Sequence, residues 1–304
     1  MIYTCTMNLA IDLYMGTEEL IPFEVNRMQE ADYQPNGKGV NVSFILKELG
    51  IDNTALGFCG GFTGEFIKTE LEKKGIKTDF VAVDGINRIN VFTRVKAQNL
   101  EYKMVNAGPT VKPEQIEALL AKIATLTSED TLVVSGSNPV GVEFWVLEAI
   151  AKLSVEKGFK FVLDHSSAFV PTLFSYKPYL LKPNDEELAH WVGKETLTVP
   201  EMVMYGKEFV KKGVGKLLIS LGKEGAVLIT PDTVLQVTAP KGEVVNTACA
   251  GDTLLGTYLA SIHQGLSEQE ALIKAVAAGS STAFRAGLTD FSDVDVLSQQ
   301  IMIK

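Results

Sequence analysis

The 304-residue chain is predicted to adopt an α/β fold, with helices on both faces of a central, mostly parallel β-sheet and a small second β-sheet that forms a lid. The first observation behind this prediction is that short apolar runs alternate with segments whose apolar residues recur at helical spacing. The second is that residues 13–35 and 78–106 contain strand-like runs with no helix between them. We therefore expect a single domain, residues 1–304, from which the lid projects.

The strands and helices of the main body are expected in alternation along the chain. Strands are predicted at 2–9, 55–58, 131–135, 159–164, 179–181, 216–220 and 226–229, and helices at 40–49, 65–74 and 293–301. Two further helices begin at capping boxes, in which Thr198 pairs with Glu201 and Ser267 with Glu270. Ligands bind at the carboxyl ends of the strands in such a sheet, so polar residues that follow a strand are candidate site residues.

The lid is expected to contain strands at 80–83, 89–96 and 102–105, in which apolar and polar residues alternate. A sheet that is apolar on one face has to cover a ligand cleft or a partner subunit. We predict a homodimer that pairs through the lid, with Ile89, Val91 and Phe92 as candidates for the buried face.

Charge and composition exclude several classes of function. A net charge of −9 argues against nucleic acid as a partner. No apolar run reaches the roughly 20 residues that cross a bilayer, and the N-terminus lacks the features of a signal peptide. The dispersed cysteines Cys5, Cys59 and Cys249 match neither a disulfide framework nor a metal site. A cytoplasmic location without a membrane partner is therefore expected.

The stretch 246–260, NTACAGDTLLGTYLA, places small residues and one carboxylate directly before a helix. Its helical spacing begins near Leu254, so Ala250, Gly251 and Asp252 are expected in the first turn, where free N–H groups attract an anion such as a phosphate. Asp252 beside that anion is a candidate base for the hydroxyl that attacks it. The alternative is that Asp252 only caps the helix.

Two glycine-containing stretches allow the close approach of a ligand. In the stretch 36–39, Asn-Gly-Lys-Gly, the glycines expose the main chain and Lys38 adds a positive charge. The spacing is neither that of a Walker A loop nor that of a dinucleotide fingerprint, and an ordinary turn before a helix is the alternative. Gly222 and Gly225, which follow Ser220, suit either a hairpin turn or the approach of nucleotide phosphates.

Other polar residues lie at the ends of predicted strands. Asn184 and Glu187 are spaced either to cap a helix or to hold a hydrated Mg²⁺ ion. Asp12 follows the first strand and either holds sugar hydroxyls or is a loop carboxylate. Arg88 precedes a lid strand and either binds a phosphate or is solvated. Asp164 ends a strand at the edge where ligands usually bind.

Together these motifs resemble those of the ribokinase-like sugar kinases, in their phosphofructokinase-B branch, over essentially the whole chain. The resemblance rests on the stretches 8–12, 37–41, 88–90, 135–137, 182–187, 220–225 and 250–252, which occur in this order. It implies a ribokinase-like fold, ATP and Mg²⁺ as cofactors, and phosphoryl transfer to a ketohexose phosphate. Fructose 1-phosphate, which yields fructose 1,6-bisphosphate, is the expected substrate, and tagatose 6-phosphate and fructose 6-phosphate are the near alternatives.

The resemblance also implies a role for each candidate residue. Asp252 is expected to be the base, with Ala250 and Gly251 forming the anion hole. The sugar and its phosphate are expected to contact Asp12, Gly37, Lys38, Asn41, Arg88 and Ser137, with Arg27 and Lys103 reaching in from the lid. The nucleotide is expected at Lys182, Asn184, Ser220, Gly222, Gly225 and Gly251, and Mg²⁺ at Glu187, Asn184 and Asp164 through water.

Three residues depart from the pattern of these kinases. Asn36 stands where the loop usually has its first glycine, Leu9 where the first strand usually ends in proline, and Cys249 where a glycine usually precedes Ala250. Asparagine tolerates a positive φ better than most residues, so the turn at Asn36 is expected to survive. A side chain at position 249 either crowds the anion hole or changes the local φ, and both effects bear on turnover.

Two other classes of function have to be weighed against a kinase. A non-catalytic sugar-phosphate sensor on the same fold has no need of a base such as Asp252. A nicotinamide-dependent oxidoreductase needs a Gly-x-Gly-x-x-Gly stretch after the first strand, which this chain lacks. The kinase is therefore the preferred interpretation.

Overall fold

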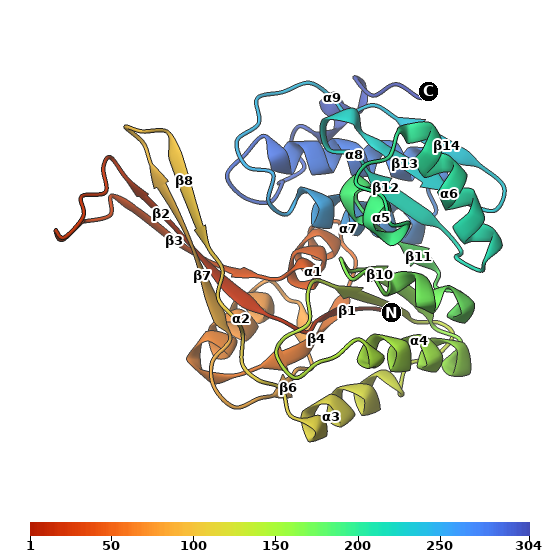
Figure 1. Cartoon of the computed structure of the whole chain (residues 1–304), viewed down its shortest axis with the longest axis horizontal. Coiled ribbons are helices and arrows are strands. Elements are labelled where there is room, and N and C mark those ends of the chain that lie inside the picture. Colours follow the sequence, from red (N-terminus) through yellow and green to blue (C-terminus); the bar gives the residue numbers. More distant parts are fainter.

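A ten-stranded sheet forms the centre of the computed structural model, which describes all 304 residues (Figure 1). Its strands are β1 (Ile2–Thr6), β4 (Asn53–Cys59), β5 (Lys77–Thr78), β6 (Val81–Ala82), β9 (Thr131–Ser135), β10 (Lys160–Asp164), β11 (Leu180–Leu181), β12 (Leu217–Ser220), β13 (Ala226–Ile229) and β14 (Val234–Val237). They lie in the order β14-β13-β12-β11-β10-β9-β1-β4-β5, and β6 pairs with the C-terminal end of β4. All neighbours from β12 to β5 are parallel, and β13 and β14 are antiparallel, so the predicted mostly parallel sheet is confirmed.

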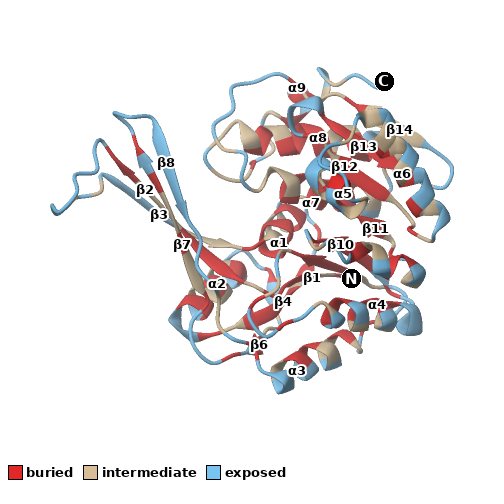
Figure 2. Ribbon diagram, viewed as in Figure 1, coloured by how far each residue is buried: buried red, intermediate tan, exposed pale blue.

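Helices cover both faces of this sheet. They are α1 (Lys38–Glu48), α2 (Gly61–Lys73), α3 (Pro113–Ile123), α4 (Trp145–Lys157), α5 (Asp185–Trp191), α6 (Val199–Lys211), α7 (Ala250–His263), α8 (Glu268–Ala283) and α9 (Val294–Ser298), with two short 3-10 helices, η1 (Val170–Tyr176) and η2 (Gly222–Glu224). One apolar core lies under α3, α4 and α6, and the other under α1, α7 and α8 (Figure 2). Both predicted capping boxes, at the starts of α6 and α8, are present. None of the helices is long and apolar enough to cross a lipid bilayer.

The lid is a separate four-stranded sheet that projects from the main body (Figure 1). It contains β3 (Glu30–Asn36), β2 (Ala10–Thr17), β7 (Arg88–Val95) and β8 (Leu100–Met104), in that order across the sheet. The predicted strand at 80–83 is wrong as a lid strand, because β6 pairs with β4 in the central sheet. The predicted strand at 2–9 is also too long, because β1 ends at Thr6 and the chain enters the lid at Ala10.

The register of the lid strands decides which residues share a face. Asp12 lies opposite Asn90, and Tyr14 opposite Phe92, with which it stacks at a ring-centroid distance of 5.1 Å. Since side chains alternate along a strand, Val91 lies on the other face from Phe92. The prediction that Ile89, Val91 and Phe92 share one buried face is therefore wrong for Phe92.

Candidate active site

The first turn of α7 carries Asp252, as predicted. Its N-cap residue is Cys249, which has a left-handed φ of 64° and makes no side-chain capping hydrogen bond. Asp252 is 6% exposed, and its side chain accepts a hydrogen bond from Asn41 instead of capping the helix. Burial, reinforced by the carboxylate of Asp164, raises the pKa of Asp252 to about 7, although two lysines and the Asn41 amide oppose the rise. A carboxylate with a pKa near neutrality is suited to take a proton from a hydroxyl.

Two lysines and a buried aspartate lie beside Asp252. Asp164 is fully buried. Its Oδ1 lies 2.9 Å from Nζ of Lys38, and its Oδ2 lies 3.1 Å from Nζ of Lys182. Burial disfavours the charged form of Asp164, but the two ammonium groups outweigh it and lower the pKa. Lys182 Nζ also lies 3.5 Å from the place that a Cβ on Gly251 would occupy. Positive charge is thus concentrated at the N-terminus of α7, where free N–H groups already favour an anion.

One side of the site is built on the lid, around Asp12. Asp12 lies within β2, the strand that follows β1, and is buried, so the alternative of a loop carboxylate is wrong. Its carboxylate accepts hydrogen bonds from Asn90 at 2.8 Å and from Asn36 at 2.5 Å. Burial raises the pKa of Asp12 against the effect of these two donors. Asn90 was assigned no role from the sequence, although it belongs to the stretch 88–90, because the register that places it opposite Asp12 follows from the pairing of β2 with β7.

Asn36 contributes through its side chain and not through its backbone conformation. It ends β3 without a positive φ, and Gly37 takes that conformation instead, with φ of 138°. The main-chain N–H of Gly37 donates to Oδ1 of Asn36 at 2.5 Å. The turn survives, as expected, but the tolerance of asparagine for a positive φ is not the reason.

A small hollow of about 230 Å³ next to Asp12 contains several groups that bind anions. Lys38, Arg88 and Ser137 line it. The Nε of Arg88 is buried without a hydrogen-bond partner, and its Nη2 donates at 3.4 Å to the main-chain oxygen of Asn8. Because a buried guanidinium seldom leaves an N–H unpaired, Arg88 is poised to bind an anionic group in this hollow.

Two predicted sugar-phosphate contacts are not brought to the site. Arg27 is exposed in the loop between β2 and β3. Lys103 is exposed on β8 and pairs with Glu101 at 3.1 Å. Neither residue lines the hollow or the larger cleft beside it.

The larger cleft has a volume of about 1040 Å³ and contains the predicted nucleotide residues. Lys182, Asn184, Ser220, Gly222, Gly225 and Gly251 all line it. A Cβ on Gly225 would lie 2.0 Å from the main-chain oxygen of Val237, so packing of the β12–β13 turn alone requires this glycine. Gly222, with φ of 52°, faces open space. Residues 239–242 and Phe284 also line the cleft, and no motif in the sequence pointed to them.

The predicted metal ligands are engaged in other contacts. The side chain of Asn184 caps α5 by accepting from the N–H of Glu187, and Glu187 accepts from the N–H of Asn184. The capping alternative is therefore confirmed. The Asp164 carboxylate is taken by two lysines, and no group of three or more His, Cys, Asp or Glu residues is arranged to hold a metal ion. These residues do not form a direct coordination site, and Glu187, half-buried at the cleft, fits contact with a hydrated ion only.

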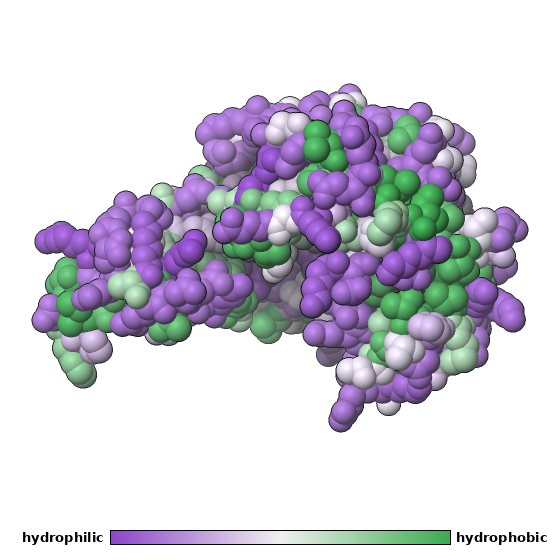
Figure 3. All heavy atoms as spheres, turned by 90° about the horizontal axis from the view of Figure 1, so that it is seen from above, coloured by the Kyte–Doolittle hydropathy of each residue, from purple (hydrophilic) through white to green (hydrophobic).

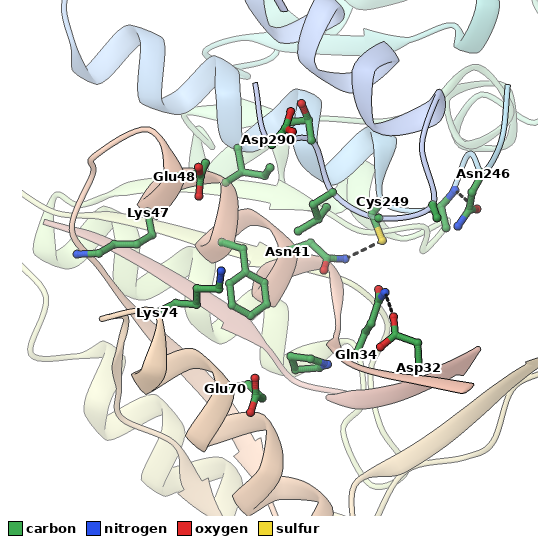
Figure 4. Close-up of a pocket in the computed structure, with 18 of the residues that line it drawn as sticks. Asp32, Gln34, Asn41, Lys47, Glu48, Glu70, Lys74, Asn246, Cys249 and Asp290 are labelled. Atoms are coloured by element: carbon green, nitrogen blue, oxygen red, sulfur yellow. Dashed lines mark hydrogen bonds between the residues drawn. The ribbon is translucent and has the colours of Figure 1, made fainter. Parts of the chain in front are cut away.

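A third cavity, of about 800 Å³, lies on the other side of Asn41 and Cys249 (Figure 4). Residues of α1, α2 and β3 line it, together with the loops 246–249 and 286–290. Cys249 also lines the cleft of about 1040 Å³, so this side chain forms part of the wall between the two spaces. The cavity was not foreseen from the sequence, in which its lining residues are scattered.

Comparison with known proteins agrees with this geometry. Residues 3–294 match the pfkB family of carbohydrate kinases. The chain is 48% identical to the D-tagatose-1-phosphate kinase of Bacillus licheniformis and 36% identical to the 1-phosphofructokinase of Bacillus subtilis, with all of this chain and 99% of each relative covered. The structure of Escherichia coli phosphofructokinase-2 in complex with substrates and products is similar, with a TM-score of 0.89, 27% identity and 98% of both chains covered.

Proposed function

Since the chain belongs to the pfkB family of carbohydrate kinases, we propose that it transfers the γ-phosphoryl group of ATP to the 6-hydroxyl of a ketohexose 1-phosphate. The observation that carries this proposal is that two cavities meet at the base. Asp12, Asn36 and Lys38 line both the cleft of about 1040 Å³ and the hollow of about 230 Å³, and Asp252 lines the cleft beside them. The cleft has room for a nucleotide, and the hollow for the phosphorylated end of a sugar.

The chemistry follows from the groups around Asp252. Its carboxylate takes the proton of the 6-hydroxyl as that oxygen bonds to the γ-phosphorus, and the bond from phosphorus to the bridging oxygen of ADP breaks. Lys182 and the N–H groups of the first turn of α7 stabilise the charge on the transferring group. Arg88 binds the phosphate already on the sugar, and Asp12 orients a hydroxyl. Glu187, at the cleft, would hold a hydrated Mg²⁺ that accompanies ATP, and the ion would add positive charge beside the phosphates.

The identity of the sugar rests on the activities for which two relatives are named. One is named for tagatose 1-phosphate and the other for fructose 1-phosphate, and these ketoses are epimers at C4. Both carry the phosphate on O1 and have a free 6-hydroxyl, so both suit the same phosphate-binding hollow. We propose both as substrates, with fructose 1-phosphate as the sequence-based expectation and tagatose 1-phosphate favoured by the higher identity.

A substrate panel tests the proposal. ADP release is measured with fructose 1-phosphate, tagatose 1-phosphate, fructose 6-phosphate, tagatose 6-phosphate, fructose and ribose. A charge-assisted contact is worth about 1.5–3 kcal/mol, so Arg88 and Lys38 together predict a preference of at least about 100-fold in kcat/KM for the 1-phosphates over free sugars. A best activity with fructose or ribose contradicts the assignment of the hollow. If a 6-phosphate gives the highest activity, the assignment of the hollow as a phosphate site still holds. The proposed orientation of the sugar, with its 1-phosphate in the hollow, is then wrong.

The outer face of the lid supports the proposal of a homodimer. Leu13, Val91 and Met104 lie in register on the face opposite Asp12, and Tyr33 and Tyr102 on the same face are 59% and 46% exposed. Apolar residues also gather at the far end of the lid (Figure 3). A second copy of the chain, placing its own lid against this face, would cover it. A cytoplasmic location is proposed as well, in keeping with three cysteines that are all free.

A further inference from the structure

The amide group of Asn41 lies among three polar groups that can accept its hydrogen bonds. Asn41, on α1, is 4% exposed. Its Nδ2 is 2.8 Å from Oδ2 of Asp252, 3.0 Å from Oδ1 of Asn36 and 3.1 Å from Sγ of Cys249. Figure 4 shows this amide and the thiol of Cys249 from the side of the third cavity. Asn41 supplies the one side-chain hydrogen bond that Asp252 accepts.

The orientation of this amide is fixed by its neighbours. Asn36 accepts from the N–H of Gly37 through Oδ1 and donates to Asp12 through Nδ2, so it presents an oxygen to Asn41. The Asp252 carboxylate also presents an oxygen. Asn41 must therefore turn its NH₂ group toward both. One hydrogen goes to Asp252 and the other is shared between Asn36 and Cys249, so both donors of the amide are engaged within the protein.

We propose that Asn41 is a positioning residue that holds the Asp252 carboxylate in place. This inference rests on the proposed function, because it assigns a role within the same site. It adds a role to the expected contact with a sugar hydroxyl, which Oδ1 of Asn41 can still make as an acceptor. With Oδ2 of Asp252 occupied by Asn41, Oδ1 is the oxygen left to receive the proton of the attacking hydroxyl.

The two unusual residues of this chain are part of the same arrangement. Asn36 and Cys249, where related kinases usually have glycine, both accept the second hydrogen of Asn41. A glycine at either position would leave this part of the wall without a side chain, and the amide with one acceptor fewer. Asn36 and Cys249 therefore restrict the rotation of the Asn41 side chain, and with it the direction of the hydrogen bond to Asp252.

The test is the pH dependence of kcat in Asn41→Leu, which keeps the size of the side chain but loses both donors. Lys38 on α1, Asp164 at the end of β10, Lys182 after β11 and the Cys249 thiol face Asp252 and are unchanged in this variant. Loss of a hydrogen bond to the charged form raises the pKa of the base by about one to two pH units. At pH 7, where the native base is about half ionised, kcat is expected to fall about 5–50-fold and to recover toward pH 9. An unmoved pH profile overturns the inference, and a rise in KM beside it would leave Asn41 as a sugar contact only.

Two further variants keep the test decisive. Asn41→Asp has the same shape and places a second carboxylate against Asp252, so it is expected to move the pH profile in the same direction. Asn53→Leu is the matched control, because Asn53 is equally buried but donates only to the main-chain oxygens of Ser43 and Ile51. This control is expected to lose stability without any change in the pH profile.

A measurement that needs no turnover separates the two proposals. In protein labelled with ¹³C at the aspartate carboxyl groups, the NMR signal missing from Asp252→Asn identifies Asp252. Its titration is then compared between the native chain and Asn41→Leu. If no sugar phosphate is a substrate, the proposed function fails, yet a higher pKa of Asp252 in the variant still supports the positioning role. An unchanged titration overturns the inference whether or not the chain is a kinase.

Discussion

Replacing Asp252 with asparagine is expected to stabilise the protein at pH 8 and, at the same time, to remove its activity. In the folded chain the pKa of Asp252 is raised from 3.8 to about 7, mainly by burial and then by Asp164. Above pH 7 the fold therefore holds a carboxylate that would be more stable in the unfolded chain. Asparagine has nearly the same shape without the charge, so it relieves this cost. The proton acceptor is lost as well, and kcat is expected to fall by on the order of 10²–10⁴-fold.

The size and the pH window of the effect follow from the same pKa. Between pH 4 and pH 7 the folded native chain keeps a proton that the unfolded chain releases, so its stability falls as the pH rises through this window. About three pH units at about 1.4 kcal/mol each give an upper limit of about 4 kcal/mol for the gain in Asp252→Asn. Favourable contacts with Lys38 and Lys182 already lower this pKa, so their loss is included in the limit of about 4 kcal/mol at pH 8.

Urea unfolding at pH 4, 5 and 8 measures the effect. The difference in unfolding free energy between Asp252→Asn and the native chain is expected to be near zero at pH 4, to grow as the pH rises and to level off above pH 7. Asp232→Asn, at an exposed position in a turn, is the control and is expected to show no such growth. An equal difference at pH 5 and pH 8 would refute the raised pKa, and a variant that retains most of its kcat would refute the assignment of the base.

Three other predictions concern the sugar phosphate, the unusual thiol and the lid. Arg88→Ala is expected to lower kcat/KM for ketohexose 1-phosphates by about 10–100-fold and to leave free fructose unaffected, as steady-state assays with both sugars will show. Cys249→Gly is expected to keep or raise kcat, because glycine adopts the φ of 64° without strain and Asn36 still accepts the second hydrogen of Asn41, and a large loss would contradict this. Sedimentation velocity at micromolar concentration is expected to show a dimer, and Met104→Glu, on the outer lid face, a monomer; a native monomer with full activity would count against the dimer.

The architecture was largely predictable because its signals are local. The strand at 131–135 and the two capping boxes depend on neighbouring residues, and they are found where predicted. The errors lie where a distant partner decides the structure. Residues 81–82 resemble a lid strand in sequence but pair with β4, and Asp12 belongs to the lid because β2 finds β7. Spacing along the chain does not contain this information.

The candidate site was predictable in its residues more than in their contacts. Asp252, Gly251 and Lys182 line the cleft as expected, since each belongs to a short stretch that can be recognised by itself. The pairing of Lys38 with Asp164 joins residues 126 positions apart, and the amide of Asn41 reaches Asp252 over 211 positions. Such contacts change the role that a residue was expected to have. Asp164 was expected to contact a metal ion through water, but it forms ion pairs with two lysines. The sequence supplies no register or burial from which these contacts could be derived.

The residues that orient the sugar lie on the lid, and the base and the lysines lie on the main body. These two parts of the molecule are joined only at the base of the lid. Asp12 and Asn90 lie on lid strands, whereas Asp252 and the lysines belong to the main body. From Ala10, where β2 leaves the body, Asp12 is about 7 Å away and the strand end at Thr17 about 23 Å away, at about 3.3 Å per residue. Asp12 therefore lies about one third of the way from the base of the lid to its tip. A rotation that moves the tip by about 3 Å moves Asp12, and the hydroxyl that it orients, by about 1 Å relative to the phosphorus atom. A misplacement of about 1 Å lowers a reaction rate on the order of 100-fold, so substitutions at the tip of the lid, far from any substrate, would lower turnover.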